Sequence, residues 1–235
     1  MNLPEIMDRL AALGSASIKK TLLRHGAVEP LFGVKIGDLQ PLRKALKGRQ
    51  DLAAALYDTA NSDAMYLAGL LADGSKMTIA QLDHWADTAT WPLIASCPVA
   101  WTAAEHPDAF SLARKWIASD RQNTAIAGWS TLSSLAATRP DDSLPIPDLN
   151  QLLDLIEGSI HGQPDAIRYQ MNGFIIACGT YVAPLADTAL ALAERLGKIE
   201  VDMGDTACKV PDAASCILKS RKGGKIPPKR KSMRC

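Results

Sequence analysis

Apolar residues recur along the chain at intervals of three and four positions, which is the spacing of one face of an α-helix. Strictly alternating runs, which would indicate strands, are confined to residues 32–36 and 199–203, and both lie beside glycine. The clearest helical stripes are Leu3, Ile6, Leu10 and Leu13; Phe110, Ala113 and Ile117; Leu149, Leu152, Leu153, Ile156 and Ile160; and Tyr181, Leu185, Leu192 and Leu196. The pattern predicts roughly eleven to thirteen helices and no sheet.

The helices are expected to form antiparallel pairs. Residues 52–73, 112–137 and 149–179 share one plan, in which an apolar helix, a short polar turn and a second helix follow one another. The second helices carry a small residue at the expected contact point, namely Gly69, Gly128 and Gly173. The first helices are centred on Leu56, Trp116 and Ile156, which are 60 and 40 residues apart, so one further pair fits at residues 78–104. Because HEAT-type arrays use units of about 40 residues, we expect an all-α, HEAT-like α-solenoid that forms a curved superhelix over residues 1–218. An irregular helical bundle is the alternative.

Charge is distributed unevenly, although the formal net charge is only +1. Residues 1–50 hold nine Lys and Arg against four Asp and Glu, residues 51–218 hold nine against twenty-one, and residues 219–235 hold eight against none. The tail also has paired glycines and prolines and no apolar stripe, so it is expected to be a disordered basic segment. A polyanionic partner would have to bind a localised face and the basic ends of the chain.

Composition excludes several classes of protein. An apolar share of 47% is too high for a disordered chain. Glu5 and Asp8 interrupt the apolar N-terminal stretch, and no long uncharged segment is suited to a bilayer, so a cytoplasmic protein is expected. The five cysteines show no zinc-binding spacing and no glycine-rich phosphate loop occurs, so neither a metal nor a cofactor is predicted. The roles of Cys208, Cys216 and Cys235 stay open.

Short motifs distributed over most of the chain point to one family. They are residues 33–43 (GVKIGDLQPLR), Thr90-Trp91, His106-Pro107, residues 116–120 (WIASD), residues 171–174 (MNGF), residues 196–198 (LGK), residues 201–204 (VDMG) and residues 208–211 (CKVP). Together they resemble the DNA alkylation repair (AlkD-like) family of HEAT-like repeat proteins, and the C-terminal motifs resemble a branch that ends in a basic tail with a terminal cysteine. The resemblance implies cleavage of the N-glycosidic bond of positively charged alkylated purines in DNA.

The site that the resemblance implies is incomplete in this chain. Loss of a cationic base leaves an oxocarbenium-like sugar, which a nearby carboxylate stabilises. The family's carboxylate position falls on Ala95 or Ser96, and its basic, phosphate-binding position falls on Ala127 or Gly128. Trp91 is the one aromatic residue that matches, although Trp101 or Trp129 could occupy the space of a second one.

A relocated carboxylate is the alternative to a lost one. Asp87 lies four residues before Trp91 and could share a helix face with it, and Glu105 is a further possibility. The candidate catalytic residues are therefore Trp91 and Asp87, and whether the protein is an enzyme stays open.

Basic residues form the better-supported candidate site. A solenoid can hold DNA by contacts between its cationic side chains and the phosphates, although solvated helix faces are the ordinary alternative. The candidate DNA-binding residues are Lys35, Arg43, Lys44 and Lys47 in an N-terminal helical region; Arg121, Arg168, Lys198 and Lys209 at turns or helix ends; and Lys229, Arg230 and Lys231 in the tail.

Three functions are compatible with these features. The favoured hypothesis is a monomeric protein that binds duplex DNA by its backbone, with weak or no base excision. The second is an active DNA glycosylase for 3-methyladenine- or 7-methylguanine-type lesions with a rearranged site. The third is an α-solenoid scaffold that binds a protein partner.

Overall fold

The computed structural model describes residues 1–234, and Cys235 lies outside the described residues. The α-helices are α1 (Leu3–Leu13), α2 (Ala16–Arg24), α3 (Gln40–Ala45), α4 (Gln50–Tyr57), α5 (Ser62–Leu71), α6 (Ile79–Thr88), α7 (Pro92–Ile94), α8 (Ala100–Ala103), α9 (Ala109–Ile117), α10 (Gln122–Thr138), α11 (Ile146–Ser159), α12 (Asp165–Tyr181), α13 (Ala186–Leu196) and α14 (Ala213–Ser220). No strand occurs in this part of the chain, and residues 199–203 are irregular. The prediction of an all-helical protein is confirmed.

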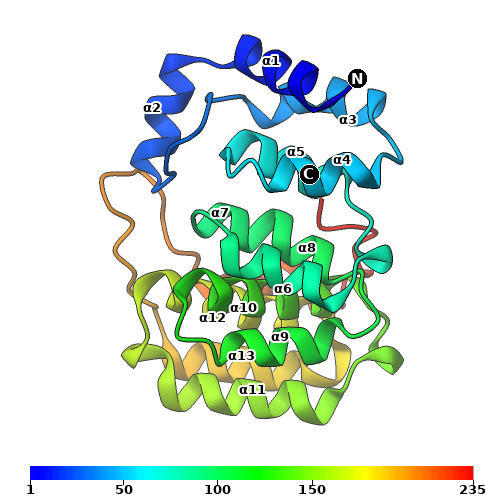
Figure 1. Cartoon of the computed structure of the whole chain (residues 1–235). Coiled ribbons are helices and arrows are strands. Elements are labelled where there is room, and N and C mark those ends of the chain that lie inside the picture. Colours follow the sequence, from blue (N-terminus) through cyan, green and yellow to red (C-terminus); the bar gives the residue numbers. More distant parts are fainter. Residues whose placement is uncertain (235) are drawn as a thin grey trace.

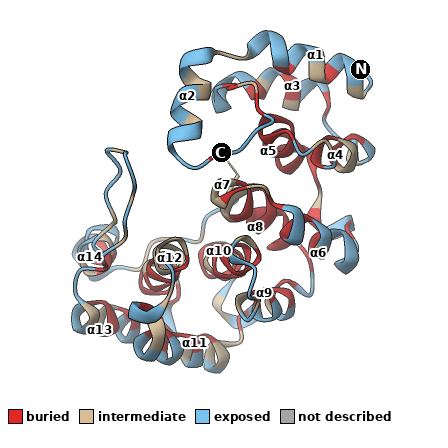
Figure 2. Cartoon of the chain, turned by 60° about the vertical axis from the view of Figure 1, so that its left-hand side comes forward, coloured by how far each residue is buried: buried red, intermediate tan, exposed pale blue. Residues whose placement is uncertain are grey.

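The helices stack in two curved layers (Figures 1 and 2). One layer contains α5, α7 with α8, α10, α12 and α14, and these helices contact one another in that order. The other layer contains α4, α6, α9, α11 and α13. Three of the pairs that the sequence predicted are present, because α4 packs on α5, α9 packs on α10, and α6 packs on the helix that contains α7 and α8. In the predicted pair over residues 149–179, α11 packs on α13, and α12 packs on α10, α13 and α14. This is the HEAT-like arrangement that the sequence predicted.

The first layer is the interior of the molecule, as the burial colours of Figure 2 show. All ten residues of α5 are buried, and α10 is buried along most of its length. Such burial requires small residues where backbones approach. A Cβ atom on Gly69 would lie 2.5 Å from Cβ of Pro98, and one on Gly128 would lie 2.7 Å from the backbone nitrogen of Ile117. These two glycines are the close contact points that the sequence predicted.

The prediction for Gly173 is wrong. A Cβ atom there would meet nothing within 4 Å, whereas one on Gly179 would lie 2.4 Å from Cδ1 of Ile217. The close contact of α12 is therefore made with α14, one and a half turns further along the helix. The period of the apolar stripe places both glycines on α12 but does not reveal which neighbour each one faces.

Residues 92–103 form one bent helix that comprises α7, the π-helical segment Ala95–Val99 and α8. Pro98 lies inside it and has no N–H to donate, which interrupts the regular hydrogen-bond ladder and accounts for the wider turn. The position at which the family resemblance places a carboxylate is thus part of an irregular helical turn.

Asp63 connects the N-terminal segment to the inner layer. Its carboxylate accepts hydrogen bonds from the backbone N–H groups of Phe32 at 2.6 Å, Gly33 at 3.0 Å and Val34 at 2.9 Å. Asp63 lies in the first turn of α5, where the helix dipole also favours a negative charge. The loop that leads into α3 is therefore fixed by one buried side chain.

The C-terminal segment differs from the disordered tail that the sequence predicted. The Arg221 guanidinium donates to the Gly179 carbonyl at 2.7 Å, and Lys229 Nζ donates to the Ala136 carbonyl at 2.9 Å. The backbone N–H of Arg230 donates to the Ala137 carbonyl at 2.8 Å. These carbonyls lie in the last turns of α12 and α10, where unpaired carbonyl groups and the helix dipole attract cations.

Acidic side chains beside the same helix ends pair with the tail as well. Lys229 lies 2.7 Å from the Asp141 carboxylate, Arg221 lies 3.0 Å from that of Asp187, and Arg234 lies 2.6 Å from that of Glu105. Part of the acidic middle of the chain therefore holds the basic tail along the ends of the stacked helices.

No single helix within residues 1–234 is long and apolar enough to cross a membrane. One bent pair, Asp165–Tyr181 with Ala183–Leu196, meets the length and composition criteria, but its two helices diverge by 112°.

Candidate nucleic-acid interface

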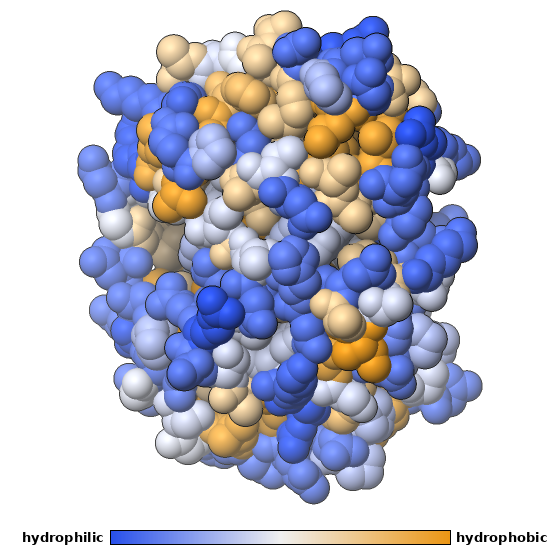
Figure 3. All heavy atoms as spheres, viewed as in Figure 1, coloured by the Kyte–Doolittle hydropathy of each residue, from blue (hydrophilic) through white to orange (hydrophobic). Residues whose placement is uncertain are grey.

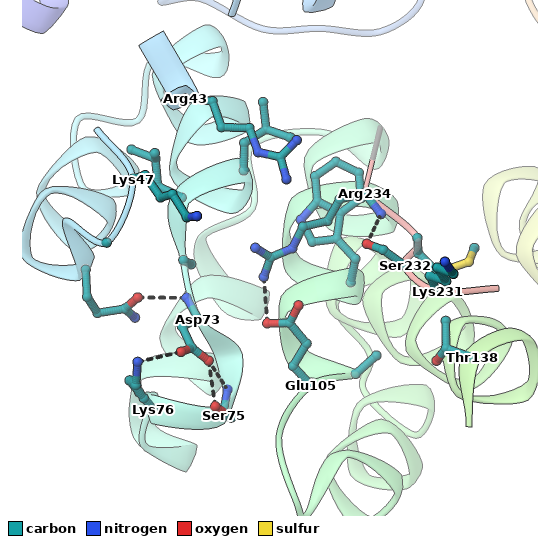
Figure 4. Close-up of a pocket in the computed structure, with 18 of the residues that line it drawn as sticks. Arg43, Lys47, Asp73, Ser75, Lys76, Glu105, Thr138, Lys231, Ser232 and Arg234 are labelled. Carbon is teal, nitrogen blue, oxygen red and sulfur yellow. Dashed lines mark hydrogen bonds and ion pairs between the residues drawn. The ribbon is translucent and has the colours of Figure 1, made fainter. Parts of the chain in front are cut away.

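The two basic ends of the chain meet across one pocket (Figure 4). One wall is formed by α3 and the residues that follow it, and the opposite wall is formed by residues 231–234 of the tail. The pocket has a volume of about 920 Å³. Its basic residues are Arg43, Lys44, Lys47, Lys76, Arg139, Lys231 and Arg234, and its acidic residues are Asp73 and Glu105. We refer to this set as the basic pocket.

Some of these cations already have partners within the fold. Lys76 pairs with Asp73 at 2.8 Å, and Arg234 pairs with Glu105. Arg139 donates to the carbonyls of Ala104 and His106 at 3.1 and 3.3 Å, so it caps the end of α8. Both acids are therefore engaged, and their charge does not neutralise the rest of the pocket.

Other cations of the pocket have no acidic partner. Among the described residues, no carboxylate lies within ion-pair distance of Lys44, Lys47 or Lys231. Arg43 makes only a long hydrogen bond, of 3.4 Å, to the amide oxygen of Gln40 within that part of the chain. Lys44, Lys47 and Lys231 are exposed to solvent, so they can reach an anion.

Arg234 is a largely buried cation of the pocket. Its side chain is 13% exposed, and burial lowers the pKa of the guanidinium, an effect that Glu105 opposes and Arg43 reinforces. Its Nε atom is buried without a hydrogen-bond partner. An anion between Arg43 and Arg234 would reduce the repulsion between them.

The structure places four of the predicted DNA-binding residues in this pocket, namely Arg43, Lys44, Lys47 and Lys231. Lys229 and Arg230 lie next to it along the tail and bind the end of α10. Lys35 is exposed before α3 and is not part of the pocket lining.

The remaining predicted DNA-binding residues lie away from the pocket. Arg121 pairs with Asp87 at 3.7 Å, and Arg168 pairs with Asp165 one turn before it on α12. Lys198 pairs with Glu200 at 2.9 Å, and Lys209 is exposed in the loop before α14. Arg121 and Arg168 lie near the starts of α10 and α12, at the opposite ends of these helices from the tail.

Sequence reasoning missed Lys76, Arg139 and Arg234. Arg234 belonged to the recognised basic tail, but its position beside Glu105 depends on how the tail packs. Arg139 follows directly on α10, and an arginine at a helix C-terminus is a usable signal because cations favour that end. No local pattern distinguishes Lys76 from an ordinary surface lysine.

The positions of the excision machinery are occupied by small buried residues. Ala95 is fully buried, and Ser96 is half-buried in the π-helical turn. Ala127 is fully buried, and at Gly128 even a methyl group would collide with the backbone of α9. A longer side chain at Gly128 would not fit without movement of α9.

The candidate catalytic residues are not placed as a catalytic pair. Trp91 is 5% exposed at the start of α7, and its indole N–H is buried without a partner. Asp87 accepts a hydrogen bond from Thr124 Oγ1 at 3.1 Å and pairs with Arg121, so it connects α6 to the start of α10. Its carboxylate therefore has a structural role in joining two helices.

The other tryptophans are core residues. Trp85 stacks on Tyr57 with ring centroids 4.1 Å apart, and Trp129 lies 5.7 Å from Phe174. Trp116 donates its indole N–H to Asp83 at 2.8 Å, and Trp101 donates to the Gly69 carbonyl at 3.0 Å. All five tryptophans are at most 5% exposed, so none presents a face for base stacking in this conformation.

Metal binding has no support from side-chain geometry. Within residues 1–234, no group of three or more His, Cys, Asp or Glu side chains is arranged to hold a metal ion. The surface in Figure 3 is mainly hydrophilic, with apolar side chains in small separate patches.

Comparison with known proteins agrees with the fold and the motifs. The family model described as DNA alkylation repair enzyme matches residues 6–200. An uncharacterized protein of Listeria monocytogenes is 35% identical over 223 residues, which cover 92% of this chain and 96% of that protein. A relative from Listeria innocua is 34% identical with the same coverage.

One solved structure matches along the whole chain. It has a TM-score of 0.91 and 34% sequence identity, and it covers 100% of both chains. That protein represents a new family related to the HEAT-like repeat DNA glycosylases, with affinity for branched DNA structures. The family model covers most of this chain and the relatives cover nearly all of it, so the protein belongs to the DNA alkylation repair family of HEAT-like repeat proteins.

Proposed function

We propose that this protein binds DNA, preferentially at branches, through contacts of the basic pocket and its surroundings with phosphates, and that it does not excise bases efficiently. The observation that carries the proposal is the meeting of the N-terminal basic helix and the basic tail across one pocket. Charges that are about 190 residues apart in sequence are concentrated on one surface. Phosphate contacts of lysine and arginine supply most of the affinity in sequence-independent DNA binding.

Two further findings support the proposal. The solved relative with affinity for branched DNA shares the fold along its whole length. In addition, the family resemblance places the catalytic carboxylate at Ala95 or Ser96 and the basic, phosphate-binding residue at Ala127 or Gly128, and none of these four residues is charged. Absence of a transition-state carboxylate costs several kcal/mol of activation free energy, about two to three orders of magnitude in rate for a single electrostatic contact.

Salt dependence tests the DNA-binding part. Fluorescence anisotropy with a labelled three-way junction and a linear duplex of equal length would give the affinity at several salt concentrations. If about six phosphates are neutralised, log K falls against log[salt] with a slope near −5. A flat salt response, or no binding to either DNA at low salt, contradicts the proposal.

A matched pair of variants identifies the surface. Arg43→Gln with Lys47→Gln removes two charges from the basic pocket. Lys20→Gln with Arg114→Gln removes two exposed charges from α2 and α9, outside the pocket lining. The pocket variant should bind the junction at least tenfold more weakly, and the control should bind it nearly as well as the unaltered protein. Equal losses for the two variants would assign the effect to net charge alone.

The excision part is tested separately. The protein is incubated with methylated DNA, and the released bases are measured by chromatography. We expect no release above the spontaneous rate. Release that Asp87→Asn abolishes would show that Asp87 acts as a relocated carboxylate and would favour the second hypothesis.

A further inference from the structure

The basic pocket is too small for a duplex. Its volume of about 920 Å³ is that of a site for a ligand of a few nucleotides. Figure 4 shows that Arg43 and Lys47 approach it from one side and Arg234 from the other. A duplex can lie over the pocket, but only a single strand can enter it.

The lining suits a strand with phosphates on one side and bases on the other. Four cations without an acidic partner, Arg43, Lys44, Lys47 and Lys231, are available for phosphate oxygens among the described residues. Half-buried Met233 adds apolar surface to the same pocket, on which a base or a sugar can lie, and the buried Leu70 and Leu71 form the wall behind it. Proteins that bind single strands combine a positive groove with such surfaces, although they usually use aromatic residues for stacking.

Arg234 gives an independent indication that an anion belongs here. It is largely buried close to Arg43, and among residues 1–234 its Nε atom has no hydrogen-bond acceptor. Its carboxylate partner there, Glu105, also accepts from the backbone N–H of Gly74 at 2.9 Å. A phosphate oxygen would supply the missing acceptor and would offset the repulsion between the two guanidinium groups.

We propose that the basic pocket holds the phosphates of a single DNA strand that leaves the duplex at a branch. This inference rests on the proposed function and specifies its site. A branch with a flap or a fork supplies a strand that is not paired with its complement, and a linear duplex does not. The preference for branched DNA then follows from pocket size and charge, without any contact that reads base sequence.

The test compares a duplex that carries a short single-stranded flap with the same duplex that has a nick and no flap. The unaltered protein should bind the flap at least tenfold more tightly. Arg43→Gln with Lys47→Gln should reduce flap binding by about tenfold and nicked-duplex binding by less than threefold. Lys20→Gln with Arg114→Gln should leave the ratio of the two affinities unchanged.

The outcomes separate this inference from the proposed function. Salt-sensitive binding of equal strength to both DNAs overturns the inference and the preference for branches, and leaves standing only DNA binding through phosphate contacts, whereas no binding to either overturns both proposals. Equal weakening on both DNAs by the pocket variant also contradicts the inference.

A cross-link locates the strand directly. A flap with 4-thiothymidine near its free end is irradiated, and the attached peptides are identified by mass spectrometry. Attachment within residues 231–234 or residues 43–48 supports the assignment, and attachment confined to other segments overturns it. Free tripolyphosphate and a short unattached oligonucleotide serve as competitors of the flap. If only the oligonucleotide displaces the flap, the ligand is a nucleic-acid strand. If only tripolyphosphate displaces it, the ligand is a free polyphosphate and the proposal is overturned.

Discussion

Replacement of Asp63 with alanine should destabilise the whole protein, because its carboxylate holds the loop that leads to the basic helix. Asp63 is 5% exposed and accepts three backbone hydrogen bonds, and the donors of Gly33 and Val34 are buried. Each buried N–H that loses its acceptor costs about 1–3 kcal/mol. Phe32 N–H is only partly buried, so water can replace its partner. The expected loss is therefore about 4 kcal/mol in the free energy of unfolding.

Urea or thermal unfolding followed by circular dichroism measures this loss. For a chain of this length, about 4 kcal/mol corresponds to a decrease of roughly 8–16 °C in Tm. Asp63→Asn keeps one acceptor oxygen and should lose about half as much. Asp120→Ala is the matched control, because Asp120 is an exposed aspartate and its change should stay within about 0.5 kcal/mol.

Hydrogen exchange provides a second measurement that is specific to the proposed cause. The amides of residues 32–34 should lose protection in Asp63→Asn, whereas amides in the middle of α10 should change only as global stability changes. A loss below about 1 kcal/mol for Asp63→Ala, or unchanged protection at residues 32–34, would refute the reasoning. Because these residues precede α3, their release should also weaken DNA binding through the basic pocket.

Three further predictions concern packing, thiol reactivity and the tail. Gly128→Ala should destabilise the protein by about 1–3 kcal/mol, because its Cβ would lie 2.7 Å from the backbone nitrogen of Ile117. Gly173→Ala should stabilise it by about 0.5–1 kcal/mol, because alanine has the higher helix propensity and the position has open space. Urea unfolding of the two variants distinguishes a loss of stability from a gain. Iodoacetamide should label the exposed Cys208 in the native protein and leave Cys178 unlabelled, because Cys178 is buried and burial raises the pKa of its thiol. Peptide mass spectrometry measures the labelling, and labelled Cys178 in the native protein would contradict the prediction. Lys229→Met should cost about 1–2 kcal/mol, because it removes a partly buried ion pair and a hydrogen bond to a helix C-terminus, and unchanged stability would show that the tail is not held in this way.

The sequence by itself determined the helices and most of their pairing, because both depend largely on local information. Apolar spacing sets which face of a helix is buried, and polar turns such as the one at Asn61, whose side chain accepts from the N–H groups of Asp63 and Ala64, set where a helix begins. The sequence also indicated that the site implied by the family resemblance is incomplete. That expectation depends on residue identity at Ala95 or Ser96 and at Ala127 or Gly128, and the structure adds that a Cβ atom at Gly128 would collide with α9.

Only the tertiary structure decided which charges act together. Arg43 and Arg234 are far apart in sequence, and they meet because the curvature of the helical stack brings α3 toward the ends of the inner helices, along which the tail runs. Arg121 and Asp87 were predicted for different roles and pair with each other instead. The tail is a second case in which the sequence was not sufficient, because its composition predicts disorder although the fold holds it in place. Its position in the fold depends on carbonyl groups and carboxylates that become neighbours only when the helices have stacked.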